Sequence, residues 1–257
     1  MPPMSRIIAV AWFIFVIVTS AMVFPMAVLT WVSTVLFDRR LKALHLLTCF
    51  WASLYTWIMP SWPISIRGKE KIRKDAAYVI VSNHQSQLDI LALFRLFIHF
   101  KWVSKIEIFK IPVIGWNMLL NRYIKLRRGD RESVRAMMEH SERTLAEGSS
   151  VFIFPEGTRS HDGVLKKFKT GAFELAKKMK VPILPIVISG TRDALPKHSM
   201  NYHGSHPIRI RILDELHYRE FCDMSIEMLA QRVWNLMDEA LQTISLPLQY
   251  LIMFIIT

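Results

Sequence analysis

The chain has 257 residues, of which 52% are hydrophobic and 21% charged, and its formal net charge at pH 7 is +12. This length suits one domain of ordinary size and little more. A chain this apolar can bury enough surface to offset the entropy lost on folding, which excludes a disordered protein. The positive charge predicts an acidic partner, and anionic lipid, nucleic acid and phosphorylated substrates all fit. Cys49 and Cys222 are far apart without metal-ligand spacing, so neither a disulfide framework nor a zinc site is expected.

The N-terminal segment predicts contact with a membrane. Residues 7–37 contain no charged side chain, and a helix of about 20 apolar residues spans a bilayer. The run is long enough to cross once with tilt, but Pro25 divides it into two shorter arms. We favour a hairpin that enters one leaflet and returns, because Arg6 and the charged cluster at 38–40 then both meet anionic headgroups. A cleaved secretory signal is disfavoured, since the apolar run is too long and its basic start is weak.

Two further apolar stretches each allow two interpretations. Residues 41–60 carry Trp51, Tyr55 and Trp57 in their second half, and such rings favour the headgroup zone of a membrane. An amphipathic helix packed in the protein core explains the same pattern. Residues 246–256 are apolar but too short to span, so they form either a packed terminal helix or a further membrane contact.

Beyond residue 60, strand and helix patterns alternate. Short apolar or alternating runs predict strands at residues 64–66, 76–81, 151–154, 183–188 and 208–212. Helical periodicity predicts helices at residues 133–145, 168–179 and 225–244. The order predicts an α/β fold, with a mixed, largely parallel sheet flanked by helices and preceded by an apolar helical membrane anchor.

His84 and Asp89 directly follow one of the strands expected to be buried. Residues five apart do not share a helix face, so the two side chains meet only if the backbone turns between them. Ser86 can provide that turn as the N-cap of a helix with Asp89 in its first turn. Asp89 would then accept a hydrogen bond from one imidazole nitrogen and leave the other free as a base. The alternative is that Asp89 only completes a capping box.

The segment Phe-Pro-Glu-Gly-Thr-Arg-Ser at residues 154–160 also follows an apolar strand. Pro155 stops sheet pairing, and Gly157 permits a close backbone approach. Glu156 and Arg159 are expected to project where a ligand can reach them, and the planar fork of arginine matches phosphate oxygens. A surface turn with a local Glu–Arg ion pair is the alternative.

Three other features carry less functional weight. The basic concentration at residues 105–135 contains no recognised nucleic-acid module, so a solvated or membrane-facing surface is expected there and no nucleic-acid partner. His198, His203 and His206 are separated by residues typical of a flexible loop, so no metal site is expected. A G-x-S-x-G motif, the nucleophile turn of α/β serine hydrolases, does not occur.

Taken together, these motifs resemble the glycerophospholipid acyltransferase family, and most closely the bacterial lysophosphatidic acid acyltransferases. The resemblance covers roughly residues 65–215, and four blocks carry it in the family's order: residues 83–89; Lys105, Pro112, Gly115 and residues 123–128; residues 154–160; and residues 181–185. The second block departs from the family at Arg122, where glycine is usual, and at Arg127, where aspartate is usual. These departures bear on the choice of acceptor headgroup.

The resemblance implies transfer of a fatty acyl group from acyl-CoA or acyl-carrier protein to the sn-2 hydroxyl of lysophosphatidic acid, without a cofactor. His84 would act as the base, Asp89 would stabilise its imidazolium, and Lys105 would stabilise the developing oxyanion. The remaining candidates would bind substrate: Asn83, Arg128, Glu156, Gly157, Thr158 and Arg159.

The same resemblance implies a division of the chain and a location. Residues 1–60 would be a membrane-associated helical segment, residues 61–245 the catalytic domain, and residues 246–257 an apolar tail. A bacterial inner membrane is expected, with the catalytic domain facing the cytoplasm. Two alternatives stay open, namely an acyltransferase for glycerol 3-phosphate or a lyso-aminolipid, and a non-catalytic basic protein that binds anionic membranes.

Overall fold

A seven-stranded sheet forms the centre of the molecule. The computed structural model describes residues 3–160, 162–195 and 205–245. The strands lie in the order β1-β7-β6-β2-β5-β3-β4, and all neighbours are parallel except β6 and β7. Their bounds are β1 Ile64–Arg67, β2 Val79–Ser82, β3 Phe100–Lys105, β4 Ile124–Leu126, β5 Ser150–Ile153, β6 Ile183–Ser189 and β7 Ile208–Ile212.

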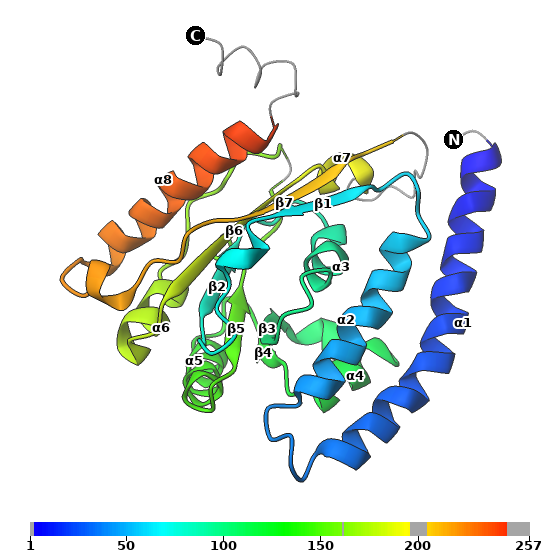
Figure 1. Cartoon of the computed structure of the whole chain (residues 1–257), viewed down its shortest axis with the longest axis horizontal. Helices are drawn as coiled ribbons and strands as arrows, with labels where there is room; N and C mark the ends of the chain where they lie inside the picture. Colours follow the sequence, from blue (N-terminus) through cyan, green and yellow to red (C-terminus); the bar gives the residue numbers. More distant parts are fainter. Residues whose placement is uncertain (1–2, 161, 196–204, 246–257) are drawn as a thin grey trace.

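Helices cover both faces of this sheet (Figure 1). One face carries α5, α6 and α8, while α2 and α3 lie on the other, with α1 outside α2. The bounds are α1 Pro3–Thr34, α2 Lys42–Trp57, α3 Leu88–Phe94, α4 Ile114–Leu120, α5 Arg131–Ala146, α6 Gly171–Met179, α7 Thr191–Ala194 and α8 Ile226–Ser245, with short 3-10 turns η1 Lys69–Lys71, η2 Ile106–Lys110 and η3 Tyr218–Glu220.

The central strand β2 shows why helices cover both faces of the sheet. Val79 and Val81 pack into the core beneath α5, α6 and α8, whereas Ile80 packs into the core beneath α2 and α3. Successive side chains on a strand point to opposite faces, so a continuous apolar run requires both faces to be buried. The predicted fold class, a mixed and largely parallel sheet flanked by helices, is therefore confirmed.

Two strands at the end of the sheet were not expected from the sequence. β3 contains Lys101 between Phe100 and Trp102, and this charge interrupts the apolar pattern that marks the other buried strands. β4 is only three residues long and lies within the basic stretch. β3 pairs with β5 and β4 pairs with β3, both in parallel, and this pairing depends on contacts between segments apart in the sequence.

The predicted hairpin within residues 7–37 is wrong. α1 continues through Pro25 as one helix of 32 residues, which Figure 1 shows bending along its length. Proline removes one backbone donor, but its fixed φ is compatible with a helix, so it can kink a helix without ending it. The chain reverses later, after Thr34, and α2 then packs back along α1.

The Tyr55 hydroxyl group helps to join α1 to α2. The Tyr55 hydroxyl of α2 accepts from Thr19 Oγ1 at 3.2 Å and lies 3.0 Å from Ser20 Oγ, both on α1. Trp51 Nε1 donates to the same oxygen. Because these polar groups are paired in an otherwise apolar contact, they fix how the two helices face each other.

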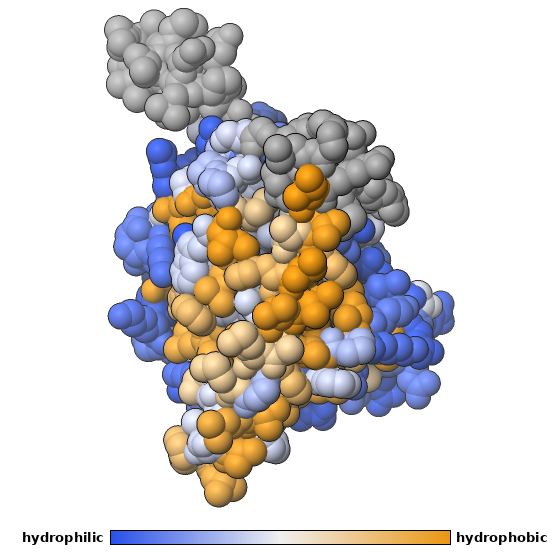
Figure 2. Space-filling model, turned by 90° about the vertical axis from the view of Figure 1, so that its right-hand side faces the viewer, coloured by the Kyte–Doolittle hydropathy of each residue, from blue (hydrophilic) through white to orange (hydrophobic). Residues whose placement is uncertain are grey.

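The outer face of α1 remains exposed. Among the described residues, one helical stretch, Val10–Thr34, is long and apolar enough to cross a membrane, and only 11% of its most apolar window is buried in the protein. Figure 2 shows apolar side chains gathered over this side of the molecule. The C-terminal stretch 246–256 lies outside the described residues, so its predicted roles stay open, as does the predicted division into domains.

Lys101 is the most unusual charged group of the core. It is 4% exposed, and its Nζ donates to the backbone oxygen of Asn121 at 2.8 Å. Burial lowers the pKa of Lys101 from 10.5 to about 7, and the nearby charge of Arg122 acts in the same direction. Between these two values the unfolded chain binds one more proton than the folded chain, so stability rises with pH.

We therefore expect the free energy of unfolding to increase from pH 7 to pH 9 by about 2 kcal/mol through this group. Urea unfolding at several pH values measures the increase. Lys101→Met should remove it, whereas Lys74→Met, at an exposed lysine, should retain it. An increase that survives in Lys101→Met would contradict the assignment.

Candidate functional site

The structure brings His84 and Asp89 into direct contact. His84 Nδ1 lies 2.8 Å from Asp89 Oδ2. The same carboxylate oxygen accepts from the backbone N–H of Gln85 at 2.6 Å and of Ser86 at 2.9 Å. Asp89 is fully buried. The predicted turn between the two side chains is therefore confirmed, and Asp89 both closes the turn and holds the imidazole.

The helix start differs from its prediction by one residue. α3 begins at Leu88 with Gln87 as N-cap, rather than with Ser86 as N-cap. Ser86 Oγ still accepts from Leu88 N at 3.3 Å and donates to the Leu195 backbone oxygen at 2.7 Å. The second bond anchors the turn to the segment after α7, a contact that local sequence does not specify.

The imidazole ring is also held from the side. It stacks on Phe154 with ring centroids 4.2 Å apart, and Phe154 stacks in turn on Trp102. The His84 side chain is 13% exposed and lines a cavity. Within the described part of the chain, His84 Nε2 has no hydrogen-bond partner, so one ring nitrogen is fixed by Asp89 and the other is available as a base.

Glu156 does not project toward a ligand, as the sequence had predicted. It is 4% exposed. Its Oε1 accepts from the backbone N–H of His84 at 2.7 Å, and its Oε2 accepts from that of Lys166 at 3.1 Å. Burial raises the pKa of Glu156 to about 7, although these two hydrogen bonds act in the opposite direction. The predicted ligand-facing placement is wrong because the loop folds over the carboxylate.

Asn83 is likewise turned away from the cavity. Its Nδ2 donates to the Ile188 backbone oxygen and its Oδ1 accepts from Ile188 N, both at 2.8 Å. Through these bonds, the Asn83 side chain continues the hydrogen bonding between β2 and β6 beyond the end of β2. The Asn83 side chain therefore joins two strands, and the predicted contact with substrate does not fit its buried position.

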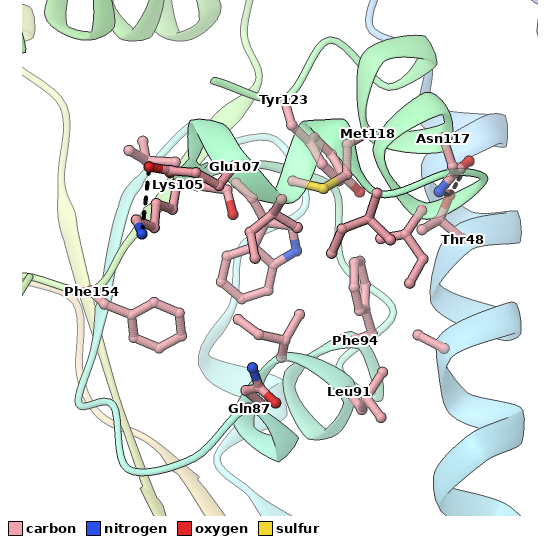
Figure 3. Close-up of a pocket in the computed structure, with 18 of the residues that line it drawn as sticks. Thr48, Gln87, Leu91, Phe94, Lys105, Glu107, Asn117, Met118, Tyr123 and Phe154 are labelled. Carbon is pink, nitrogen blue, oxygen red and sulfur yellow. Dashed lines mark hydrogen bonds and ion pairs between the residues drawn. The ribbon is translucent and has the colours of Figure 1, made fainter. Parts of the chain in front are cut away.

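A cavity of about 550 Å³ opens beside His84. Figure 3 shows Phe154 and Lys105 at one end and Thr48 and Asn117 at the other. The wall between them is mostly apolar and comes from α1, α2, α3, β3, η2 and α4, with Val16, Trp51, Ala52, Ile90, Leu91, Phe94, Trp102, Ile108, Ile111, Ile114 and Met118 among the lining residues. No sequence pattern predicted this cavity, because its walls come from six separate elements.

Three of the predicted cations, Lys105, Arg128 and Arg159, line the same cavity as His84. Lys105 forms an exposed ion pair with Glu107, with 3.5 Å between Nζ and Oε1. Positive charge on the wall that His84 also lines suits an anionic substrate.

Gly157 and Thr158 lie in the neighbouring turn, outside the lining of the cavity. Gly157 has φ +69°, and an added Cβ would lie 2.8 Å from the Lys169 side chain. The positive φ therefore favours glycine in this turn. No cluster of three metal-ligating side chains occurs among the described residues. His198 and His203 lie outside those residues, so their cluster with His206 stays undescribed.

The geometry agrees with comparisons to known proteins. A model of the family described as Acyltransferase matches residues 63–189, a segment that contains both motifs. Residues 63–189 belong to the acyltransferase family. The acyltransferase segment thus runs from the start of the sheet to the end of β6.

Curated relatives extend the similarity beyond this segment. A chloroplastic 1-acyl-sn-glycerol-3-phosphate acyltransferase of Brassica napus is 37% identical over 82% of this chain and 60% of the relative. One from Arabidopsis thaliana is 41% identical over 71% of this chain and 51% of the relative. The chain therefore spans little more than half the length of these relatives.

A crystal structure of the 1-acyl-sn-glycerophosphate acyltransferase from Thermotoga maritima has the same fold as this chain. The match covers 96% of this chain and 99% of the other, with a TM-score of 0.75 and 22% identity. The fold similarity therefore includes the two N-terminal helices as well as the sheet.

One departure from the family pattern has a structural consequence. Arg122, where glycine is usual, has φ +54°. This left-handed conformation costs a residue with a Cβ roughly 1–2 kcal/mol, which explains why glycine suits the position. Arg127, where aspartate is usual, lies 3.9 Å from Asp130 and is exposed.

The Asp89 carboxylate leads to a testable prediction about its charge. In Asp89→Asn, the amide can no longer offer a charged acceptor to three donors, so the His84 ring should lose its fixed orientation. We expect the ring N–H of His84 to exchange with solvent faster in the variant, because a neutral amide accepts a weaker hydrogen bond than a carboxylate does. Histidine ring ¹H–¹⁵N NMR at a single pH measures this exchange, with His84→Ala to assign the signal. An unchanged exchange rate of the His84 ring N–H would contradict the prediction.

Proposed function

We propose that this protein transfers a fatty acyl group from a thioester donor to the sn-2 hydroxyl of lysophosphatidic acid, giving phosphatidic acid. The observation that carries the proposal is the His84–Asp89 pair beside an apolar cavity that cations also line. The activity for which the relatives are named supports it. The site combines a base, a place for a phosphate and a place for a hydrocarbon chain.

The reaction needs only one proton acceptor. His84 Nε2 takes the proton of the acceptor hydroxyl as its oxygen attacks the thioester carbonyl carbon. A C–O bond forms, the C–S bond breaks, and the thiolate leaves with the proton that His84 returns. Asp89 stabilises the intermediate imidazolium. Since the acceptor is itself the nucleophile, no acyl-enzyme is required.

The surroundings suit the two ends of the substrates. Arg128 and Arg159, which line the cavity, would bind the phosphate of the acceptor, and Lys105 would stabilise negative charge on the thioester oxygen. The apolar cavity would accept an acyl chain, and each CH₂ group buried there contributes about 0.8 kcal/mol. The donor is acyl-CoA or acyl-carrier protein, and no cofactor takes part in this scheme.

The proposal predicts thiol release that depends on His84. Purified protein with acyl-CoA and lysophosphatidate in mixed micelles should release CoA thiol, which a colorimetric reagent measures. His84→Ala should lower the rate by roughly 10²–10⁴-fold, the usual contribution of a positioned base. Thermal unfolding of the variant serves as the folding control. Wild-type turnover in His84→Ala would overturn the role of His84 as base.

The same assay separates the alternatives. Glycerol 3-phosphate and a lyso-aminolipid replace lysophosphatidate in parallel reactions, and the highest kcat/KM identifies the acceptor. The acyl thioester of acyl-carrier protein replaces acyl-CoA in a further reaction, which identifies the donor. A protein that binds anionic vesicles but consumes no thioester with any acceptor would be the non-catalytic membrane protein considered above.

We propose further that the exposed side of α1 inserts into a membrane. Phe13, Ile17, Met22 and Leu29 are all at least half exposed there, and Trp116 and Ile114 of α4 are exposed in addition. Both substrates with acyl chains would then reach the cavity from the lipid, since α1 and α4 also contribute to its wall. The bacterial inner membrane and a cytoplasmic orientation stay predictions.

The membrane proposal predicts that negative charge added to α1 weakens membrane binding more than the same charge added to α8. Phe13→Glu with Ile17→Glu places two charges on the exposed face of α1 and should reduce sedimentation with anionic lipid vesicles by at least tenfold. Gln231→Glu with Asn235→Glu adds the same charge with the same spacing on exposed positions of α8. Equal binding by the two variants would contradict insertion of α1.

A further inference from the structure

The backbone of His84 is held on both sides by the loop that follows β5. Its N–H donates to Glu156 Oε1 at 2.7 Å. Its carbonyl oxygen accepts from the backbone N–H of Ser160 at 2.8 Å. The proposed base therefore has two sets of restraints: its ring is held by Asp89 and Phe154, and its main chain by residues 156–160.

Glu156 is itself firmly anchored. Its second oxygen, Oε2, accepts from Lys166 N at 3.1 Å, and Lys166 Nζ donates to the Arg159 backbone oxygen at 2.8 Å. A further backbone bond, from Lys169 N to the Pro155 oxygen at 2.9 Å, closes the same loop. The carboxylate thus links the base to a loop whose two ends are tied together.

The position of Glu156 excludes contact with a substrate in this conformation. The side chain is buried, and it is not among the residues that line the cavity. Both oxygens already have backbone partners. An effect of Glu156 on the reaction must therefore pass through His84 or through the loop.

We infer that Glu156 is a positioning residue, which sets the place of the His84 imidazole by accepting the backbone N–H of His84. This inference rests on the proposed function. The physical reason is the steep dependence of proton transfer on geometry, since a displacement of about 1 Å can cost on the order of 10²-fold in rate. When it is ionised, the Glu156 carboxylate makes the shorter and stronger hydrogen bond that such placement needs.

Glu156→Gln tests the inference with almost no change of shape. The amide keeps one oxygen, but its NH₂ group then faces the second backbone N–H, so one of the two donors loses its acceptor. We expect kcat to fall on the order of 10²-fold, with the KM for lysophosphatidate changed less than about threefold. Glu156→Asp keeps both acceptors and the charge on a shorter arm, so it should recover part of kcat.

Controls separate this role from folding and from substrate binding. Glu139→Gln removes an exposed carboxylate of α5 and should leave kcat and KM unchanged. Thermal unfolding shows whether each variant is folded, and Glu156→Asp carries the test if Glu156→Gln does not fold. A raised KM at unchanged kcat in the folded variant would identify a substrate ligand and overturn the inference.

Failure of the inference differs from failure of the proposed function. If the wild-type protein releases no thiol with any acceptor, the proposed function fails. If the wild-type protein is active and Glu156→Gln matches it in kcat and KM, the function stands and the positioning role is overturned.

Discussion

One oxygen of the buried Asp89 carboxylate accepts three hydrogen bonds, from the His84 ring and from the N–H groups of Gln85 and Ser86. The other arrangements at the site depend on this one. A buried carboxylate is costly unless it is paired, so the turn between β2 and α3 must close around it. Once the turn closes, the imidazole has one orientation, with Nδ1 on Asp89 and Nε2 available at the cavity.

Parallel pairing of β2 with β5 then brings the second motif to the first. Val81 pairs with Ile153, so both strands end at the same edge of the sheet and their loops meet there. The loop after β5 supplies Phe154 beneath the His84 ring and Glu156 on the His84 backbone. It also supplies Arg159 to the cavity wall. The proposed base and the cation proposed to bind phosphate are thereby held by one loop.

The N-terminal helices give this site its apolar side. α2 contributes Cys49 and Ala52 to the core beneath the sheet, while α1 is tied to α2 through the Tyr55 hydroxyl. The same two helices supply Val16, Trp51 and Tyr55 to the cavity wall. Their exposed faces are apolar, so the helices that would contact lipid also form part of the space where an acyl chain would lie.

The sequence by itself determined the interactions that are local or strongly patterned. The His84–Asp89 contact spans five residues and has a helix-start signal between them, and the buried strands have continuous apolar runs. Only the tertiary structure decided which way the other side chains face. Asn83 pairs with Ile188, Glu156 with the His84 backbone, and the cavity forms between elements remote in sequence. The reason is physical: burial and hydrogen-bond partners depend on what packs against a residue, which its sequence neighbours do not specify.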